Sequence, residues 1–502
     1  MGILDILEPI YKAIPEIKAP EIKPTLKKRL MWTGLILLLF FLMRNINVIG
    51  LAAGGDGANL LGDYQLILGS QIGSLITVGI GPIVLASIIL QLLVGGGILN
   101  INLSEPREKA RFMAMQKLFA VLLCFFESIV YVLIGLLAPA ASPPLIPGVE
   151  MLSFITPLFV IIIAQVALGA IILMYLDEIV SKYGVGSGIG LFIAGGVSFE
   201  LFWRAFSPFS AQTHQLDLVN ASGYVFRFFM EAGTNMYASL NAYMLPILFT
   251  FVVFLVVVFA EGIHVNIPIT MGHKGTGGRY PVKFLYVSNI PVIFTVALFA
   301  NFRAISLLVQ DIPVVGLILG RVGSIMSPPY NLRYDLLAQL PHTSPVTMIL
   351  DSLQGFVLFF NPFELVSPFG ISGETIGFAF VHALFYLIIL TITCVIFGKF
   401  WVEMGNQGPE AIAGQLQKAG MSIPGFRRDP RVMTKVLQRY VPYVTILGSA
   451  FVGILAGFAD LTGALGSGMG ILLTVGIIYR LYEELAKLQL TEMHPILGKI
   501  LG

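Results

Sequence analysis

The sequence GSGIGLFI at residues 186–193 has a close counterpart, GSGMGILL, at residues 466–473. The first lies at the start of the fifth long apolar segment of the chain, and the second lies in the tenth. A second correspondence surrounds a proline, with PIV at 82–84 in the second segment and PVI at 291–293 in the seventh. Matches in equivalent segments of two halves predict an internal repeat.

Long apolar segments predict the fold class. About 20 apolar residues cross a bilayer as a helix, and continuous apolar runs predict helices rather than barrel strands. With five segments in each half, the second copy enters the membrane in the opposite orientation, so the halves form an inverted repeat. The sequence therefore predicts an all-α polytopic membrane protein. The ten predicted transmembrane helices are 30–49, 74–99, 118–138, 152–176, 184–203, 242–260, 284–302, 375–398, 441–459 and 461–479.

The composition agrees with this fold class. Of the 502 residues, 56% are hydrophobic and 12% are charged, whereas a soluble protein carries about 25% charged residues. This balance excludes a soluble globule and a disordered chain. The net charge of +2 indicates neither a nucleic-acid partner nor an acidic substrate. Cys124 and Cys394 both lie in apolar runs, so no disulfide framework is expected.

The basic residues predict the orientation of the spans. With the N-terminus in the cytoplasm, most Lys and Arg residues fall on the cytoplasmic side, as is typical of membrane proteins. A weaker eleventh segment at 345–363 would move the basic loop 402–440 to the other side, so we exclude it. Both termini are therefore predicted to be cytoplasmic. The basic residues left outside are Arg44, Arg204, Arg227, Arg303, Arg321 and Arg333.

The N-terminal segment 1–29 is charged and contains several prolines. It has no short apolar core followed by a small-residue cleavage site, so no cleavable signal peptide is expected. Ile3, Leu4, Ile6 and Leu7 predict a short helix lying on the membrane surface. A solvated tail is the alternative.

The start of the second span contains candidate breaks. Gly79, Gly81 and Pro82 favour a break in the helix, because glycine is permissive and proline lacks a backbone donor. We therefore predict a separate short helix at 62–73 and a span at 74–99. The alternative is one kinked helix.

Enzyme signatures are weak in this sequence. The six histidines are scattered without HExxH spacing, and the run GHKGTGGR at 272–279 lacks the ending of a phosphate-binding loop. A Ser187–His382 intramembrane protease dyad is a remote alternative. Glu127 is the main ionisable residue within a span, and such residues are usually functional; the alternative is a helix-packing role. The sequence predicts no catalytic residue, cofactor or metal.

Four stretches together carry a family resemblance: LITVGIGPIVLASIILQLLVGGGIL (75–99), LDEIVSKYGVGSGIGLFIAGGVS (176–198), YPVKFLYVSNIPVIF (280–294) and GALGSGMGILLTVGIIYRLYEEL (463–485). With them, the sequence resembles the SecY family, the channel-forming alpha subunits of the Sec protein translocon, and its archaeal and eukaryotic branch most. The outer segment 311–374 resembles the family least.

The resemblance implies two inverted five-helix halves around a central pore with an apolar ring. The repeat pairs Val84 with Ile293 and Ile193 with Leu473, so it selects part of that ring. The implied ring residues are Ile80, Val84, Ile189, Ile193, Ile293 and Leu473. The short helix 62–73 is the implied plug, with Gly62, Asp63, Leu66, Ile67, Leu68, Ile72 and Gly73.

The resemblance also implies a lateral gate, with spans 2 and 3 on one side and spans 7 and 8 on the other. Glu127 and Asn301 match polar gate positions, whereas Leu85 stands where relatives often have a small polar residue. The implied units are the N-terminal segment 1–29, the half 30–204, a hinge 205–240, the half 241–490 and a tail 491–502.

The resemblance further implies the partners and the location. Arg279, Arg427 and Arg428 match ribosome-docking positions, and rRNA is polyanionic. The implied partners are SecE (the gamma subunit) and a small beta subunit in a heterotrimer, the ribosome, signal peptides and nascent polypeptides, and membrane lipid. The implied location is the cell membrane. Because the sequence contains no ATP site, the implied driving force comes from a partner such as the translating ribosome.

The alternative function is a secondary transporter for a small solute. A transporter needs a polar site at the membrane midplane, whereas the matched repeat positions are apolar, which favours the channel.

Overall fold

The computed structural model describes most of the chain, with gaps. The described residues are 14–22, 24–52, 65, 67–96, 98–99, 101, 105–140, 156–210, 215–217, 221–233, 236–271, 276–285, 287, 290–309, 312, 315–326, 376–405, 407–418, 421–422 and 430–493.

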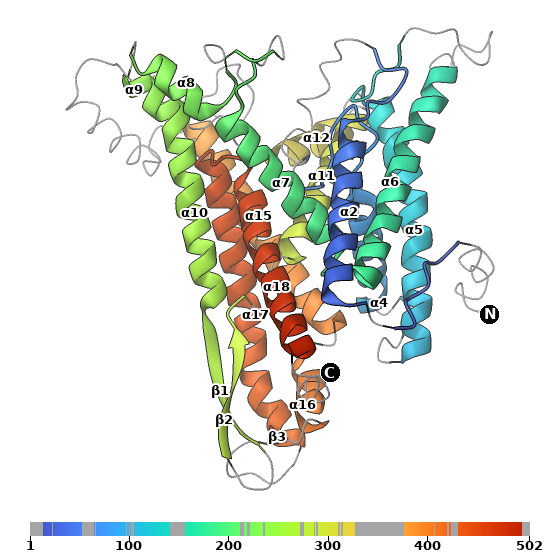
Figure 1. Ribbon diagram of the computed structural model, residues 1–502, viewed down its shortest axis with the longest axis vertical. Helices are drawn as coiled ribbons and strands as arrows, with labels where there is room; N and C mark the ends of the chain where they lie inside the picture. Colours follow the sequence, from blue (N-terminus) through green and yellow to red (C-terminus); the bar gives the residue numbers. More distant parts are fainter. Residues whose placement is uncertain are drawn as a thin grey trace.

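Ten long helices in these ranges coincide with the ten predicted spans, which confirms the fold class (Figure 1). Seven of them are long and apolar enough to cross a membrane by length and composition. The ten are α2 (Leu26–Asn45), α4 (Gly81–Gly95), α5 (Pro106–Leu133), α6 (Pro157–Tyr183), α7 (Gly188–Phe206), α10 (Leu245–Gly262), α11 (Ile290–Leu308), α15 (Ile376–Met404), α17 (Pro430–Leu461) and α18 (Gly468–Met493). The segment 345–363 lies outside the described residues.

Shorter elements lie at both ends of the bundle (Figure 1). At one end, β1 (His264–Met271) pairs antiparallel with β2 (Thr276–Lys283) and β3 (Met421–Ser422), next to α16 (Pro409–Lys418). At the other end lie α8 (Tyr224–Glu231), α9 (Met236–Ser239) and the π-helix η3 (Leu240–Met244), which leads into α10. The outer segment 311–374 includes α12 (Val315–Met326).

The two halves meet chiefly along two helix pairs. α7 of the first half packs on α18 of the second, and α4 packs on α11. One buried apolar cluster runs through both contacts and includes Val84, Ile193, Val292 and Leu473. The hydrophobic core therefore lies where the halves join.

The equivalent glycine-serine motifs share two features of their geometry, although φ is −106° at Ser187 and +61° at Ser467. Gly186 and Gly466 both have φ of +75°. Ser187 Oγ accepts a hydrogen bond from the N–H of Gly190 at 3.2 Å, and Ser467 Oγ accepts one from Gly470 at 3.1 Å. Each serine thus caps the start of its helix, α7 or α18. The internal repeat of the sequence is repeated in the local structure.

Two aspartates complete these helix starts, Asp460 fully buried and Asp177 half-buried. Asp177 Oδ1 accepts the N–H of Ile189 at 2.9 Å, and Asp460 Oδ1 accepts the N–H of Gly468 at 2.8 Å. Asp460 Oδ2 also accepts the hydroxyl of Tyr386 at 2.9 Å. A carboxylate satisfies otherwise unpaired amides at a buried helix start.

The prediction of a second span at 74–99 is wrong at its beginning. Residues 74–80 form turns, and α4 begins at Gly81. The N–H of Ile80 donates to Leu68 O at 2.8 Å. Gly79 has φ of +63°, and a Cβ there would lie 2.3 Å from the same oxygen. This close approach stops the helix, and it also excludes one continuous kinked helix.

The predicted helix 62–73 also ends early. Gln65 is helical, but Gly69 has φ of +58° and the N–H of Ser70 bonds to Gln65 O at 2.8 Å. This is a Schellman-type helix end. Residues 70–73 are therefore not helical, while Gly62, Asp63 and Leu66 lie outside the described residues.

Before α2 begins at Leu26, the described part of the N-terminal segment is neither a helix nor a free tail. Residues 15–20 have no regular secondary structure, and hydrogen bonds join their backbone to α5 and α6. Lys117 Nζ donates to Pro15 O at 2.6 Å, and the N–H of Ile17 donates to Glu178 Oε1 at 3.1 Å. The predicted surface residues Ile3 to Leu7 lie outside the described residues.

We predict that Asp460→Asn lowers the free energy of unfolding by about 2 kcal/mol, because charged hydrogen bonds contribute about 1.5–3 kcal/mol each. Asp460→Ala should cost more, since it leaves buried donors unpaired. The melting temperature of the purified protein in detergent measures both. Glu410→Gln, at an exposed position of α16, is the control, and equal melting of Asp460→Ala and this control would contradict the capping role.

Candidate functional site

The six predicted ring residues come together at the contact between the halves. Ile80 precedes α4 and Val84 lies on it, Ile189 and Ile193 lie on α7, Ile293 lies on α11 and Leu473 lies on α18. Ile80, Ile193 and Leu473 are fully buried. Five of the six belong to the central cluster, and Ile189 packs against it.

A cavity of about 450 Å³ adjoins this group of residues. Val84, Ile189 and Ile293 line it on the side of the cluster. It extends along α18 toward Arg480 and Glu484, in the direction of the end that carries α16. The remaining lining residues are Ile83, Ser87, Gln116, Gly186, Ser187, Gly190, Ile290, Phe294, Trp401, Ile477 and Leu481. The cavity is mostly apolar with polar groups near one end.

The segment before Gly79 covers the opposite side of the cluster. Ile67 and Leu68 are buried, and a Cβ on Gly69 would lie 3.6 Å from Phe192 of α7. Ile72 packs against the central cluster. Three of the predicted plug residues, Ile67, Leu68 and Ile72, therefore pack in or against the cluster that contains the ring.

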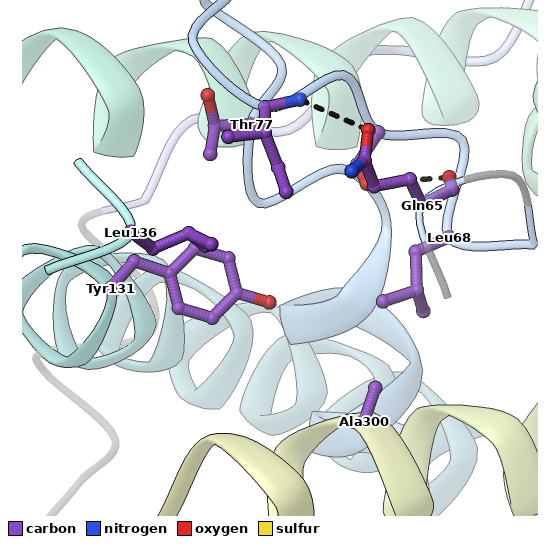
Figure 2. Close-up of a pocket in the computed structure, with 8 residues that line it drawn as sticks. Gln65, Leu68, Thr77, Tyr131, Leu136 and Ala300 are labelled. Atoms are coloured by element: carbon purple, nitrogen blue, oxygen red, sulfur yellow. Dashed lines mark hydrogen bonds between the residues drawn. The ribbon is translucent and has the colours of Figure 1, made fainter. Parts of the chain in front are cut away.

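A small void of about 10 Å³ separates this segment from α5 and α11, which is room for about one water molecule. Its wall joins Gln65, Leu68 and Thr77 to Tyr131, Leu136 and Ala300. In Figure 2 the Tyr131 hydroxyl points toward the space between Leu68, Thr77 and Ala300. The segment is thus closely packed against α5 and α11.

Sequence reasoning missed the role of Arg44 at the end of α2. Its buried guanidinium donates to Gln71 Oε1 at 3.2 Å and to Glu200 Oε2 of α7 at 3.4 Å. It also lies over the Phe199 ring, 5.1 Å from the centroid. The signal was an arginine at the edge of an apolar span, a position that usually marks a specific partner.

Backbone bonds attach the same segment to α2. The N–H of Val48 donates to Gly73 O at 2.9 Å, and the N–H of Leu75 donates to Ile46 O at 3.0 Å. The segment 70–75 is therefore fixed to the first half by both side-chain and backbone hydrogen bonds.

The predicted gate residues lie at the contact of α4, α5 and α11. Glu127 of α5 is buried, and its Oε2 would lie 3.0 Å from a Cβ on Gly81 at the start of α4. Asn301 of α11 lies beside it and donates to Ala297 O at 2.9 Å. Neither Glu127 oxygen accepts a hydrogen bond of normal geometry. Leu85 is half-buried on α4, one turn beyond Gly81.

The two predicted basic loops lie at one end of the bundle. β1 pairs with β3, with Thr270 opposite Ser422, so the loops 262–283 and 402–440 are adjacent. Their own apolar core, which includes Val402, Ile412 and Leu437, fixes α16 against α17. Arg279 lies on β2. Arg427 and Arg428 lie outside the described residues.

The remaining candidates have structural explanations. Ser187, proposed for a protease dyad with His382, caps α7. Cys124 and Cys394 are buried free thiols. Among the described residues, no group of three or more His, Cys, Asp and Glu side chains could bind a metal ion.

Comparison with known proteins gives a family. The model of the family SecY matches residues 74–482. Protein translocase subunit SecY of Methanothermobacter thermautotrophicus is 42% identical, covering 99% of this chain and 98% of the relative. The subunit of the same name from Pyrococcus furiosus is 39% identical, with 100% of both chains covered.

Solved structures give the same result. The chain is similar to one described as "The structure of a protein conducting channel", with a TM-score of 0.73, 39% identity and 98% and 99% of the two chains covered. Another concerns "The plug domain of the SecY protein", with a TM-score of 0.72, 38% identity and the same coverage. A third is Sec61 in the canine ribosome-channel complex from the endoplasmic reticulum, with a TM-score of 0.71, 38% identity and the same coverage.

We predict that Glu127→Leu raises the free energy of unfolding by about 1–2 kcal/mol. An apolar side chain of similar size removes a buried carboxyl group whose oxygens accept no hydrogen bond of normal geometry, and leaving such a group buried costs about 1–3 kcal/mol. Glu127→Gln should change stability less, because its amide would need partners too. Melting in detergent distinguishes the variants. A lower melting temperature for Glu127→Leu than for Glu127→Gln would indicate that the carboxyl group has a partner.

Proposed function

The chain belongs to the SecY family and is a channel subunit of a protein translocon, and we propose that the contact between its halves is the path of the polypeptide. The observation that carries this assignment is the position of the six aliphatic residues. They lie between a cavity of about 450 Å³ and the buried segment around Leu68. That arrangement resembles an hourglass with a closed waist.

The aliphatic side chains suit such a waist. A narrow apolar constriction loses water and so blocks ions without any fixed charge. Aliphatic chains also yield to any passing polypeptide, because they make no directional bonds. A secondary transporter would place polar groups for its solute near the midplane, whereas the six residues of this waist are all aliphatic. We therefore assign Ile80, Val84, Ile189, Ile193, Ile293 and Leu473 to the pore ring.

We assign the plug to the segment that ends at Gly69. The related SecY structure attributes stabilisation of the closed channel to its plug domain. In this chain Ile67 and Leu68 pack beside the ring, and the turns after Gly69 connect them to α4. Ile72 and Gly73 then belong to the connection rather than to the plug itself.

The exit toward lipid is assigned to the seam where α4 and α5 meet α11 and α15. α4 packs on both α11 and α15, and α5 packs on α11. Glu127 and Asn301 face each other there without a tight hydrogen bond. A seam held by few specific bonds opens at low cost, so hydrophobic segments leave through it sideways.

We assign the domains as the family resemblance implies. The halves 30–204 and 241–490 move about the connection 205–240. The segment 1–29 and the tail 491–502 lie at the cytoplasmic end, which the excess of Lys and Arg in its loops indicates. We place the chain in the cell membrane with both termini in the cytoplasm.

The end with α16 and the β-sheet is assigned to ribosome docking. The related Sec61 is part of a ribosome-channel complex. Here two basic loops are adjacent at one end, and rRNA phosphates attract Lys and Arg. SecE (the gamma subunit) and a small beta subunit complete the heterotrimer. We expect no catalysis by this chain, so the bound partner supplies the driving force.

A single-cysteine crosslink tests the path. In a Cys124→Ala, Cys394→Ala background, Ile193→Cys should crosslink to a stalled secretory chain on a bound ribosome, because Ile193 lies in the ring. Leu168→Cys, on the exposed face of α6, is the control and should not crosslink. Crosslinking at both positions or at neither, with the ribosome docked, would refute the assignment.

Charge reversal tests the docking end. Arg427→Glu with Arg428→Glu should weaken ribosome binding by about tenfold or more and flatten its salt dependence, since each lost phosphate contact lowers the salt slope. Arg279→Glu should have a smaller effect in the same direction. The matched control is Arg107→Glu with Lys109→Glu, two exposed charges at the start of α5. Co-sedimentation over a salt series measures binding, and equal effects of both pairs would mean that only net charge matters.

A further inference from the structure

The helix α8 has an apolar side whose last residues, Phe229 and Met230, are exposed, whereas Val225 and Phe226 on the same side are half-buried. Viewed along the axis of α8, Tyr224, Arg227 and Glu231 lie on the other, more polar side, together with Phe228. None of its residues is buried, and Phe229 and Met230 are 71% and 48% exposed. A helix on the surface of a soluble protein has the reverse arrangement, with its apolar side on the core.

The polar side is the one that contacts the protein. Tyr243 of η3 donates its hydroxyl to Glu231 Oε1 at 2.8 Å. The rings of Tyr224 and Tyr243 meet edge to face, with centroids 5.6 Å apart. Arg227 Nε donates to Ala221 O at 3.0 Å. These bonds fix the rotation of α8 about its axis, so its apolar side cannot turn inward.

Exposed apolar residues continue from α8 onto the neighbouring spans. Leu240, Met244, Leu248 and Phe251 recur at helical spacing along η3 and α10, and each is more than a third exposed. α8 packs on η3 and on α7, whose final turns expose Phe202 and Phe206. The exposed apolar surfaces of two spans therefore meet at α8, at the bundle end opposite α16 (Figure 1).

We propose that α8 is a membrane-interface helix, whose side formed by Val225, Phe226, Phe229 and Met230 inserts between lipid headgroups and acyl chains. Lipid is the occupant because this side continues the lipid-facing surface of α7 and α10. Tyr224 and Tyr243 at the same level are typical of interfacial residues. An amphipathic helix at this depth buries its apolar side in the headgroup boundary.

Insertion of α8 would restrict how the connection between the halves moves. α8 lies between α7, the last span of the first half, and α10, the first span of the second. Anchored in the interface, the connection keeps one depth while the halves move sideways. Nothing in this inference depends on which polypeptide the channel passes.

Depth-resolved quenching tests the proposal. The full chain with its partner subunits is placed in phosphatidylcholine–phosphatidylglycerol nanodiscs, in the Cys124→Ala, Cys394→Ala background. Single cysteines at Phe229 and at Val225 carry an environment-sensitive fluorophore. Two controls are Phe251→Cys, within the exposed face of α10, and Glu410→Cys on α16. Quenchers are aqueous iodide and lipids spin-labelled near either end of the acyl chain.

Spin labels near the headgroup end should quench Phe229→Cys and Val225→Cys at least about threefold more than Glu410→Cys, as expected for interfacial depth. Labels near the methyl end should quench Phe251→Cys best. Iodide quenching of Phe229→Cys equal to that of Glu410→Cys would place α8 in water. Protection from both quenchers would mean that a protein subunit or a second copy covers this side. Either result overturns the proposal.

Discussion

Every backbone polar group within a bilayer needs a partner from the protein, because lipid offers none. The break between Gly69 and Gly81 is the place where this constraint is hardest to meet. Leu68 O bonds to the N–H of Ile80, and backbone bonds at Val48 and Leu75 pair the rest of the segment with the end of α2. The irregular chain can therefore lie beside the ring, where a channel needs a removable cover.

The number and order of spans followed from apolar length, but their ends did not. α17 begins at Pro430 and α5 at Pro106, well before the predicted starts at 441 and 118. Hydropathy marks only the apolar part of a helix that contacts lipid. Both α5 and α17 extend beyond that part as charged segments, so their starts were missed. The break before α4 was predicted from Gly79 and Pro82. The hydrogen bond from the N–H of Ile80 to Leu68 O, which fixes that break, could not be predicted from the sequence.

The candidate site divides in the same way. The internal repeat predicted Val84, Ile193, Ile293 and Leu473, because matching short motifs in the two halves can be detected in the sequence alone. Asp177, Asp460 and Arg44 were missed, since each acts on the start of the following helix or on the segment at Gln71 and not within its own helix. A single acidic or basic residue has no pattern of its own. Such residues are found only when the packing of the helices is known.

The attachment of residues 70–75 to α2 and α7 through Arg44 and the backbone has a kinetic consequence. Anything that displaces the chain before Gly69 leaves its connection to the first half intact. Its return is then intramolecular, at an effective concentration set by a few residues of tether rather than by diffusion. Resealing should therefore be rapid and independent of protein concentration, and the cover travels with the first half when the halves separate.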